Sequence, residues 1–238
     1  MTAGSAVEIP GWYGKLPSLG DFASRRLPEE FIRPWDAWLQ ECLQASRDAL
    51  GEAWQDCYLT TPIWRFALLP GCVGPSGWAG VLMPSVDRVG RSFPLTLALA
   101  LTSSAAVAHV VFDGADWLAR LEESALGALD MERGADDLDA ALADLALAPP
   151  ASADLEATTG ALQRLPSLDA FPALARGQAL AAWSARTKWA ALWWTRGRVD
   201  DDPLMLASAG LPTTEEFGWL LQSRVPAPGQ GADRLIRP

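Results

Sequence analysis

The sequence has little lysine, one histidine, three cysteines and no asparagine. Only two of its 19 basic residues are lysines, Lys15 and Lys188, and 29 residues are acidic, so the net charge at pH 7 is −10. An acidic chain without a basic stripe repels phosphate backbones, which argues against nucleic acid as a partner. The shortage of lysine and asparagine, beside abundant alanine and arginine, is typical of a GC-rich coding genome.

Long apolar runs are also missing. Even the run Leu95–Leu101 is strand-sized, well short of the roughly 18 apolar residues that cross a membrane. The first 17 residues lack the basic region and the apolar run of a signal peptide. Cys42, Cys57 and Cys72 are widely spaced and odd in number, which favours buried or half-buried thiols in a reducing compartment. We therefore expect a cytoplasmic protein without a membrane span.

Catalytic and ligand-binding motifs are scarce. The single histidine, His109, lies in a strand-like run and no GxSxG motif is present, so we interpret it as a packed core or edge residue, not a catalytic base. Gly14 and Lys15 are followed by Leu16, where a phosphate loop would have serine or threonine. The acidic run Asp200–Asp202 lacks the ligand spacing of a calcium loop and is interpreted as a solvated turn. The sequence therefore predicts no catalytic residue, no metal and no cofactor.

Half of the residues are hydrophobic, which is enough for a substantial core. Short apolar runs bounded by proline and glycine are typical of interior strands, and they occur at 12–13, 64–69, 78–83, 93–101, 108–112, 188–195 and 204–207. Apolar residues spaced by three and four predict helices at about 28–43, 116–129, 136–145 and 213–221.

Strands without polar alternation need cover on both faces of their sheet. The sequence therefore predicts an α/β fold, specifically a three-layer α/β/α sandwich with a mixed sheet. We expect one domain over residues 1–222 with a surface connection near 148–170, followed by a flexible C-terminal tail at 223–238.

Tryptophan is abundant, with twelve residues in the chain. An indole N–H needs a hydrogen-bond partner, so we expect some of these rings at the surface or at an interface. Trp12 and Trp78 lie beside polar loops and are therefore better candidates for partner contact than Trp38 or Trp193.

Two segments rich in glycine and proline stand out as motifs. The first is GWYGKLPSLGDF at 11–22, and the second is PSVDRVGRSFPL at 84–95. In one interpretation, glycine and proline fix the turns while Asp21 and Asp87 accept backbone hydrogen bonds or pair with arginine.

A second interpretation makes the same motifs a binding site. Both loops would then lie on one rim, where Lys15, Arg88 and Arg91 form a local positive spot on an acidic protein. Asp21 and Asp87 would orient these cations. The sequence leaves both interpretations open.

The two motifs, in this order, resemble the TagF/ImpM family of type VI secretion accessory proteins. PIWRFALLPG at 62–71 and ALWWT at 191–195 extend the resemblance, which runs from about residue 9 to residue 221. It implies a cytoplasmic α/β domain without established catalytic activity, acting after translation as a repressor of type VI secretion. It also implies that the chain binds a forkhead-associated scaffold protein. Some family members carry a PP2C-type phosphatase domain, which would here be a separate chain in the same pathway.

Two other functions remain open. The chain could be an enzyme or binding protein for a phosphorylated or nucleotide ligand that uses the Lys15, Arg88 and Arg91 loops, or a structural component of the secretion apparatus. Catalysis requires a nucleophile or a base with a shifted pKa, and no residue pattern nominates one. We therefore favour a non-enzymatic binding module whose partner-binding residues are Trp12, Lys15, Asp21, Trp78, Asp87, Arg88 and Arg91.

Overall fold

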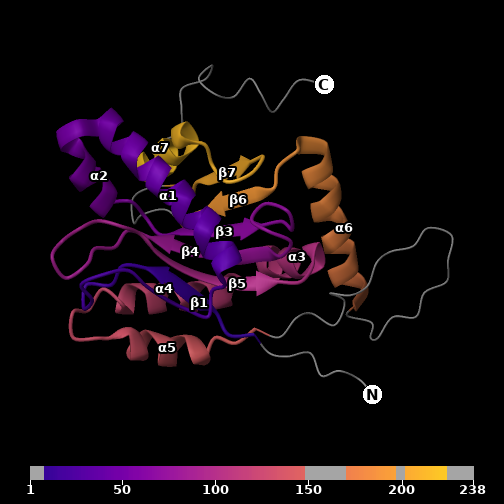
Figure 1. Ribbon diagram of the computed structural model, residues 1–238. Coiled ribbons are helices and arrows are strands. Elements are labelled where there is room, and N and C mark those ends of the chain that lie inside the picture. Colours follow the sequence, from indigo (N-terminus) through magenta and orange to yellow (C-terminus); the bar gives the residue numbers. More distant parts are fainter. Residues whose placement is uncertain (1–7, 148–169, 197–201, 224–238) are drawn as a thin grey trace.

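A single sheet forms the middle layer of the protein. The computed structural model describes residues 8–147, 170–196 and 202–223, and within them seven strands pair in the order β2-β1-β5-β4-β3-β6-β7 (Figure 1). The strands are β1 (Gly11–Gly14), β2 (Ala23–Arg25), β3 (Trp64–Leu68), β4 (Gly77–Met83), β5 (Leu95–Leu101), β6 (Ala191–Trp194) and β7 (Met205–Ser208).

Helices cover both faces of this sheet. One face carries α1 (Glu29–Leu50), the 3-10 turn η1 (Gly51–Ala53), α2 (Trp54–Leu59) and α7 (Thr214–Gln222). The opposite face carries α3 (Ser104–Asp113), α4 (Ala115–Gly127), α5 (Ala135–Ala143) and α6 (Ala170–Thr187). In Figure 1, α1, α2 and α7 lie above the sheet, and α4 and α5 lie below it. The predicted three-layer α/β/α architecture is therefore confirmed.

The direction of the strands differs from the predicted mixed sheet. Every pair of neighbouring strands in the described residues is antiparallel. Loops without a helix join β1 to β2, β3 to β4 and β4 to β5, and such connections reverse the chain, whereas a parallel neighbour needs a long crossover. Apolar runs indicate that both faces are covered, but they do not encode strand direction, which is why the mixed sheet was wrong.

The run at 108–112, predicted as a strand, is part of helix α3. The Ser103 side chain accepts a hydrogen bond from the Ala106 amide and caps the helix at its N-terminus. Ala106, Val107 and Val110 then bury one face of the helix. A short apolar run does not distinguish a buried strand from a buried helix segment. Here the Ser103 cap favours the helix.

The face covered by α1 is packed with aromatic rings. Trp35 lies 5.0 Å from Phe66 and 5.9 Å from Trp193, measured between ring centroids. The Trp35 N–H donates to the Thr96 hydroxyl, and the Trp38 N–H donates to the Pro212 carbonyl. Most buried indoles of the described residues thus donate to a partner inside the fold, and the N–H groups of Trp189 and Trp193 are the exceptions.

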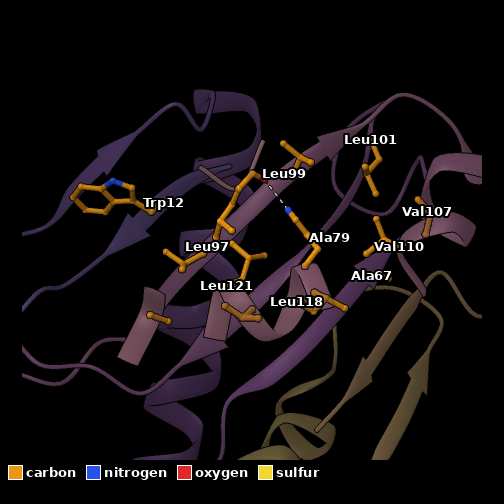
Figure 2. Packing of buried hydrophobic residues seen from close by; sticks show 14 of the residues in the cluster. Trp12, Ala67, Ala79, Leu97, Leu99, Leu101, Val107, Val110, Leu118 and Leu121 are labelled. Carbon is orange, nitrogen blue, oxygen red and sulfur yellow. Dashed lines mark hydrogen bonds between the residues drawn. The ribbon is translucent and has the colours of Figure 1, made fainter. Parts of the chain in front are cut away.

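The opposite face is built from aliphatic residues. Figure 2 shows Leu97 and Leu99 of β5 and Ala79 of β4 with Leu118 and Leu121 of α4, all of them buried in one cluster. Ala79 is fully buried in this cluster. No helix within the described residues is both long and apolar enough to cross a membrane.

The thiols agree with the sequence-based prediction. Cys42 is buried, and Cys57 and Cys72 are half-buried. Burial raises the pKa of the Cys42 thiol to about 12 and that of the Cys72 thiol to about 11. Both groups are therefore neutral at physiological pH, as expected for packed thiols.

Two segments singled out above lie outside the described residues. They are the surface connection near 148–170, apart from the start of α6, and the C-terminal tail at 223–238, apart from Ser223. A single domain over 1–222 stays a prediction.

A buried ion pair ties α4 to the sheet. Arg65 of β3 donates from Nε to Glu122 Oε1 at 2.6 Å and from Nη2 to Glu122 Oε2 at 3.0 Å. Both residues are buried, and Arg196 adds a cation 3.5 Å from the same carboxylate. Removing one partner of such a pair leaves an uncompensated charge in the core.

We therefore expect Glu122→Ala to lower the free energy of unfolding by about 3–5 kcal/mol, measured by urea denaturation. Glu123→Ala is the matched control, because Glu123 is the exposed neighbour on the same helix, and it should change stability by less than about 0.5 kcal/mol. Equal losses in the two variants would contradict a specific role for the ion pair.

Candidate functional site

The two sequence motifs meet at one end of the sheet. Residues 15–22 connect β1 to β2, and residues 84–94 connect β4 to β5. Because β1 pairs with β5 in antiparallel register, with Tyr13 opposite Thr96, the end of β1 lies beside the start of β5. Both loops therefore leave the sheet at the same end, and together we call them the two-loop rim.

Hydrogen bonds join the two loops directly. The Arg88 amide donates to the Leu19 carbonyl at 2.8 Å, and Arg91 Nη2 donates to the Gly20 carbonyl at 2.7 Å. The Ser85 hydroxyl donates to the Lys15 carbonyl at 2.7 Å. The prediction that both motifs lie on one rim agrees with this geometry.

Glycine at position 14 is required for the loops to approach. Gly14 has a φ of 139°, which L side chains rarely adopt, and a Cβ there would lie 2.1 Å from the Pro94 carbonyl oxygen. A side chain at this position would push β1 away from the start of β5. Gly14 of the Gly-Lys pair thus serves backbone packing.

A single buried carboxylate, Asp87, organises the rim. Its Oδ2 lies 3.0 Å from Lys15 Nζ and 2.6 Å from Arg91 Nε. Its Oδ1 accepts hydrogen bonds from the amides of Val89 at 3.1 Å and Arg91 at 2.9 Å. Lys15 is buried as well, so one anion and one cation of the rim lie inside the protein.

Burial alone would raise the pKa of Asp87. The hydrogen bonds from the Arg91 amide, the Lys15 ammonium, the Arg91 guanidinium and the Val89 amide outweigh that effect and hold its pKa well below the ordinary value of 3.8. Asp87 is therefore ionised at every physiological pH and fixes the conformation of its loop.

The charged residues proposed from the sequence divide into three groups. Lys15 and Asp87 are buried against each other. Arg91 contacts Asp87 but keeps 61% of its side chain exposed, and Arg88 is exposed with no carboxylate in ion-pair range among the described residues. Asp21 is exposed and accepts a hydrogen bond from the Phe22 amide. It forms no ion pair with arginine in the part of the chain that the structure describes.

The two tryptophans proposed for partner contact are buried. The Trp12 N–H donates to Asp139 Oδ1 at 2.8 Å, and the Trp78 N–H donates to the Val73 carbonyl at 3.1 Å. Their proximity to polar loops in the sequence was misleading, because both lie on strands whose two faces are covered. Neither ring is available to a partner in this conformation, so the expected surface position was wrong.

The partner-binding residues predicted from the sequence did not include Phe22, although this residue ends the first motif. Phe22 is 44% exposed, yet its ring packs edge-on against Phe93 with centroids 4.7 Å apart and stacks on Tyr13 at 6.1 Å. Lys15 Nζ lies 5.0 Å from the centre of the same ring. An apolar residue at the end of a turn-rich, polar loop was the signal in the sequence that could have identified it.

Other candidate chemistry is weak in the described residues. His109 lies on α3 with Nδ1 3.3 Å from Asp113 Oδ2, and Arg176 binds the same carboxylate. Histidine, cysteine and carboxylate side chains form no group of three or more that could hold a metal ion in the described ranges. Asp200 and Asp201 of the acidic run lie outside them.

Comparison with known proteins defines the family. The model of the TagF N-terminal domain, described as type VI secretion system-associated, matches residues 11–145. The crystal structure of PA0076 from Pseudomonas aeruginosa PAO1 is similar, with 36% identity and a TM-score of 0.75, over 91% of this chain and 96% of that one. No curated protein sequence matches. The chain therefore belongs to the TagF family of type VI secretion system-associated proteins, and both loops of the rim lie in the matched region.

We expect Asp87→Asn to destabilise the protein, because it leaves Lys15 buried without its anion. The pKa of Asp87 is lower in the folded state than in the unfolded state, so its contribution is complete above the unfolded value of 3.8 and is lost as the pH falls below it. The difference in unfolding free energy between wild type and variant should therefore be constant near neutral pH and shrink in acid, measured by urea denaturation from pH 7 to pH 2.

Asp21→Asn removes an exposed carboxylate from the same rim and serves as the control. It should leave stability and its pH dependence close to wild type. A wild-type stability that stays level through the acid range, or an equal loss in both variants, would contradict the central role of Asp87.

Proposed function

We propose that this chain is a non-enzymatic, cytoplasmic repressor of type VI secretion that binds a forkhead-associated scaffold protein. Membership of a type VI secretion-associated family supports the pathway, and the resemblance of the two loop motifs supports the mode of action. The observation that carries the proposal is the chemistry of the rim: Lys15 and Asp87 neutralise each other inside, while Arg88, Arg91 and Phe22 remain outside. Arginine and aromatic residues are typical of protein interfaces.

The same observation disfavours an enzyme that acts on a phosphorylated or nucleotide ligand. Such a site would use Lys15 as a point charge on phosphate, as phosphate-binding loops do. Here Lys15 Nζ is buried, lies 3.0 Å from Asp87 and donates to the Arg91 carbonyl at 3.3 Å. Releasing it would leave the Asp87 carboxylate buried with fewer partners, which is costly.

A binding protein of this kind acts by occupancy. The fraction of scaffold that it holds depends on its concentration relative to the dissociation constant, and no turnover is needed. We propose that any PP2C-type phosphatase of the pathway acts as a separate chain alongside this one.

The test is a titration of the purified forkhead-associated scaffold with the purified chain, in which binding is measured by isothermal titration calorimetry. We expect saturation near one equivalent and no chemical change in either protein by mass spectrometry. Multiple turnover of a phosphorylated protein or a nucleotide by the chain, or an effect on the scaffold far below one equivalent, would contradict the proposal.

A further inference from the structure

The outer surface of the two-loop rim combines apolar and cationic side chains. Phe22 is 44% exposed and Val89 is 69% exposed, and both are among the large hydrophobic residues that the fold leaves in solvent. Arg88 is exposed, and Arg91 exposes 61% of its side chain. We call these four residues the Phe22/Arg88 surface.

The two guanidinium groups lie close to each other. Arg91 Nη2 donates to the Gly20 carbonyl at 2.7 Å. A Cβ on Gly20 would lie 3.5 Å from Arg88 Nη2, so the second guanidinium lies directly over the same glycine. Both exposed guanidinium groups of the rim thus lie near Gly20, the neighbour of the exposed Asp21 in the chain, on a protein whose net charge is −10.

The rim carries three cations, Lys15, Arg88 and Arg91, against two carboxylates, Asp87 and Asp21. Asp87 is shared between Lys15 and Arg91, so one carboxylate faces two cations. Arg88 has no carboxylate in ion-pair range in the described ranges, and its backbone is held by the bond from its amide to the Leu19 carbonyl. An exposed guanidinium without a carboxylate partner is suited to bind a carboxylate from outside.

The Phe22 ring of this surface is held by its neighbours. Packing against Tyr13 and Phe93 fixes the Phe22 ring, and the Lys15 ammonium lies over it. A ring fixed before binding loses little conformational entropy when a partner covers it. Val89 lies next to Arg88 at the tip of the second loop, so apolar and charged contacts are adjacent.

We propose that the Phe22/Arg88 surface docks an acidic segment of a protein partner, with carboxylates on Arg88 and Arg91 and an apolar side chain against Phe22 and Val89. The inference rests on the proposed function and adds to it the chemistry of the segment that is recognised. Lys15 and Asp87 support this surface from inside and do not touch the partner.

The test compares Arg88→Glu with Arg33→Glu in binding to the purified forkhead-associated scaffold. Arg33 is an exposed arginine of α1 and has no ion-pair partner among the residues described, so both variants change the net charge equally. We expect Arg88→Glu to weaken binding at least tenfold, because a like charge replaces the complementary one, and to flatten the salt dependence of the dissociation constant. Arg33→Glu should stay within twofold of wild type. Equal binding by wild type and Arg88→Glu, or equal losses in both variants, would overturn the inference.

A second arm separates this surface from the identity of the scaffold. A labelled twelve-residue peptide of alternating glutamate and leucine is titrated with wild type and with Arg88→Glu at low salt, and a lysine–leucine peptide is the charge-reversed control. Binding of the glutamate peptide that Arg88→Glu removes supports the surface even if the scaffold itself does not bind wild type, in which case only the proposed function fails. Absence of binding, or equal binding of the two peptides, overturns the surface.

Discussion

One buried carboxylate holds together the end of the sheet where the function is proposed. Asp87 receives two cationic side chains and two backbone amides, and its loop is in turn bonded to the loop before β2. Buried charge is tolerated only where partners are complete, so the conformation of both loops depends on this arrangement. The rim therefore holds the backbone of both loops in place, and of its outer side chains Phe22 and Arg91 are also fixed by contacts inside the rim.

Some rim residues are buried and others face solvent, which explains why the sequence allowed both a structural and a binding interpretation of the two motifs. The rim residues serve both interpretations at once: Gly14, Lys15 and Asp87 build the turns, while Arg88 and Phe22 face solvent. Residue types alone do not distinguish the residues that build the turns from those that face solvent. The distances between side chains are needed to show which cations already have a carboxylate partner.

Much of the fold could be predicted from the sequence, because burial leaves a direct pattern. Apart from the run at 108–112, the predicted strands lie where the apolar runs indicated them, and the helices predicted at about 28–43 and 213–221 are α1 and α7. Strand direction and the helical state of His109 could not be predicted, since they depend on tertiary contacts and on a cap. The burial of Trp12 was missed for a related reason, because its partner Asp139 is distant in sequence.

The aromatic layer under α1 also has a consequence for how the chain can be divided. Trp38 reaches the Pro212 carbonyl, Trp64 reaches the Leu220 carbonyl, and β6 places Trp193 beside Trp35. The segment that matches the family model ends at residue 145, before any of these carbonyls and before β6. A chain that ended there would lack β6, which pairs with β3, and would expose tryptophan side chains of this layer to water. The segment that matches the family model thus ends before residues that complete both the sheet and the aromatic layer.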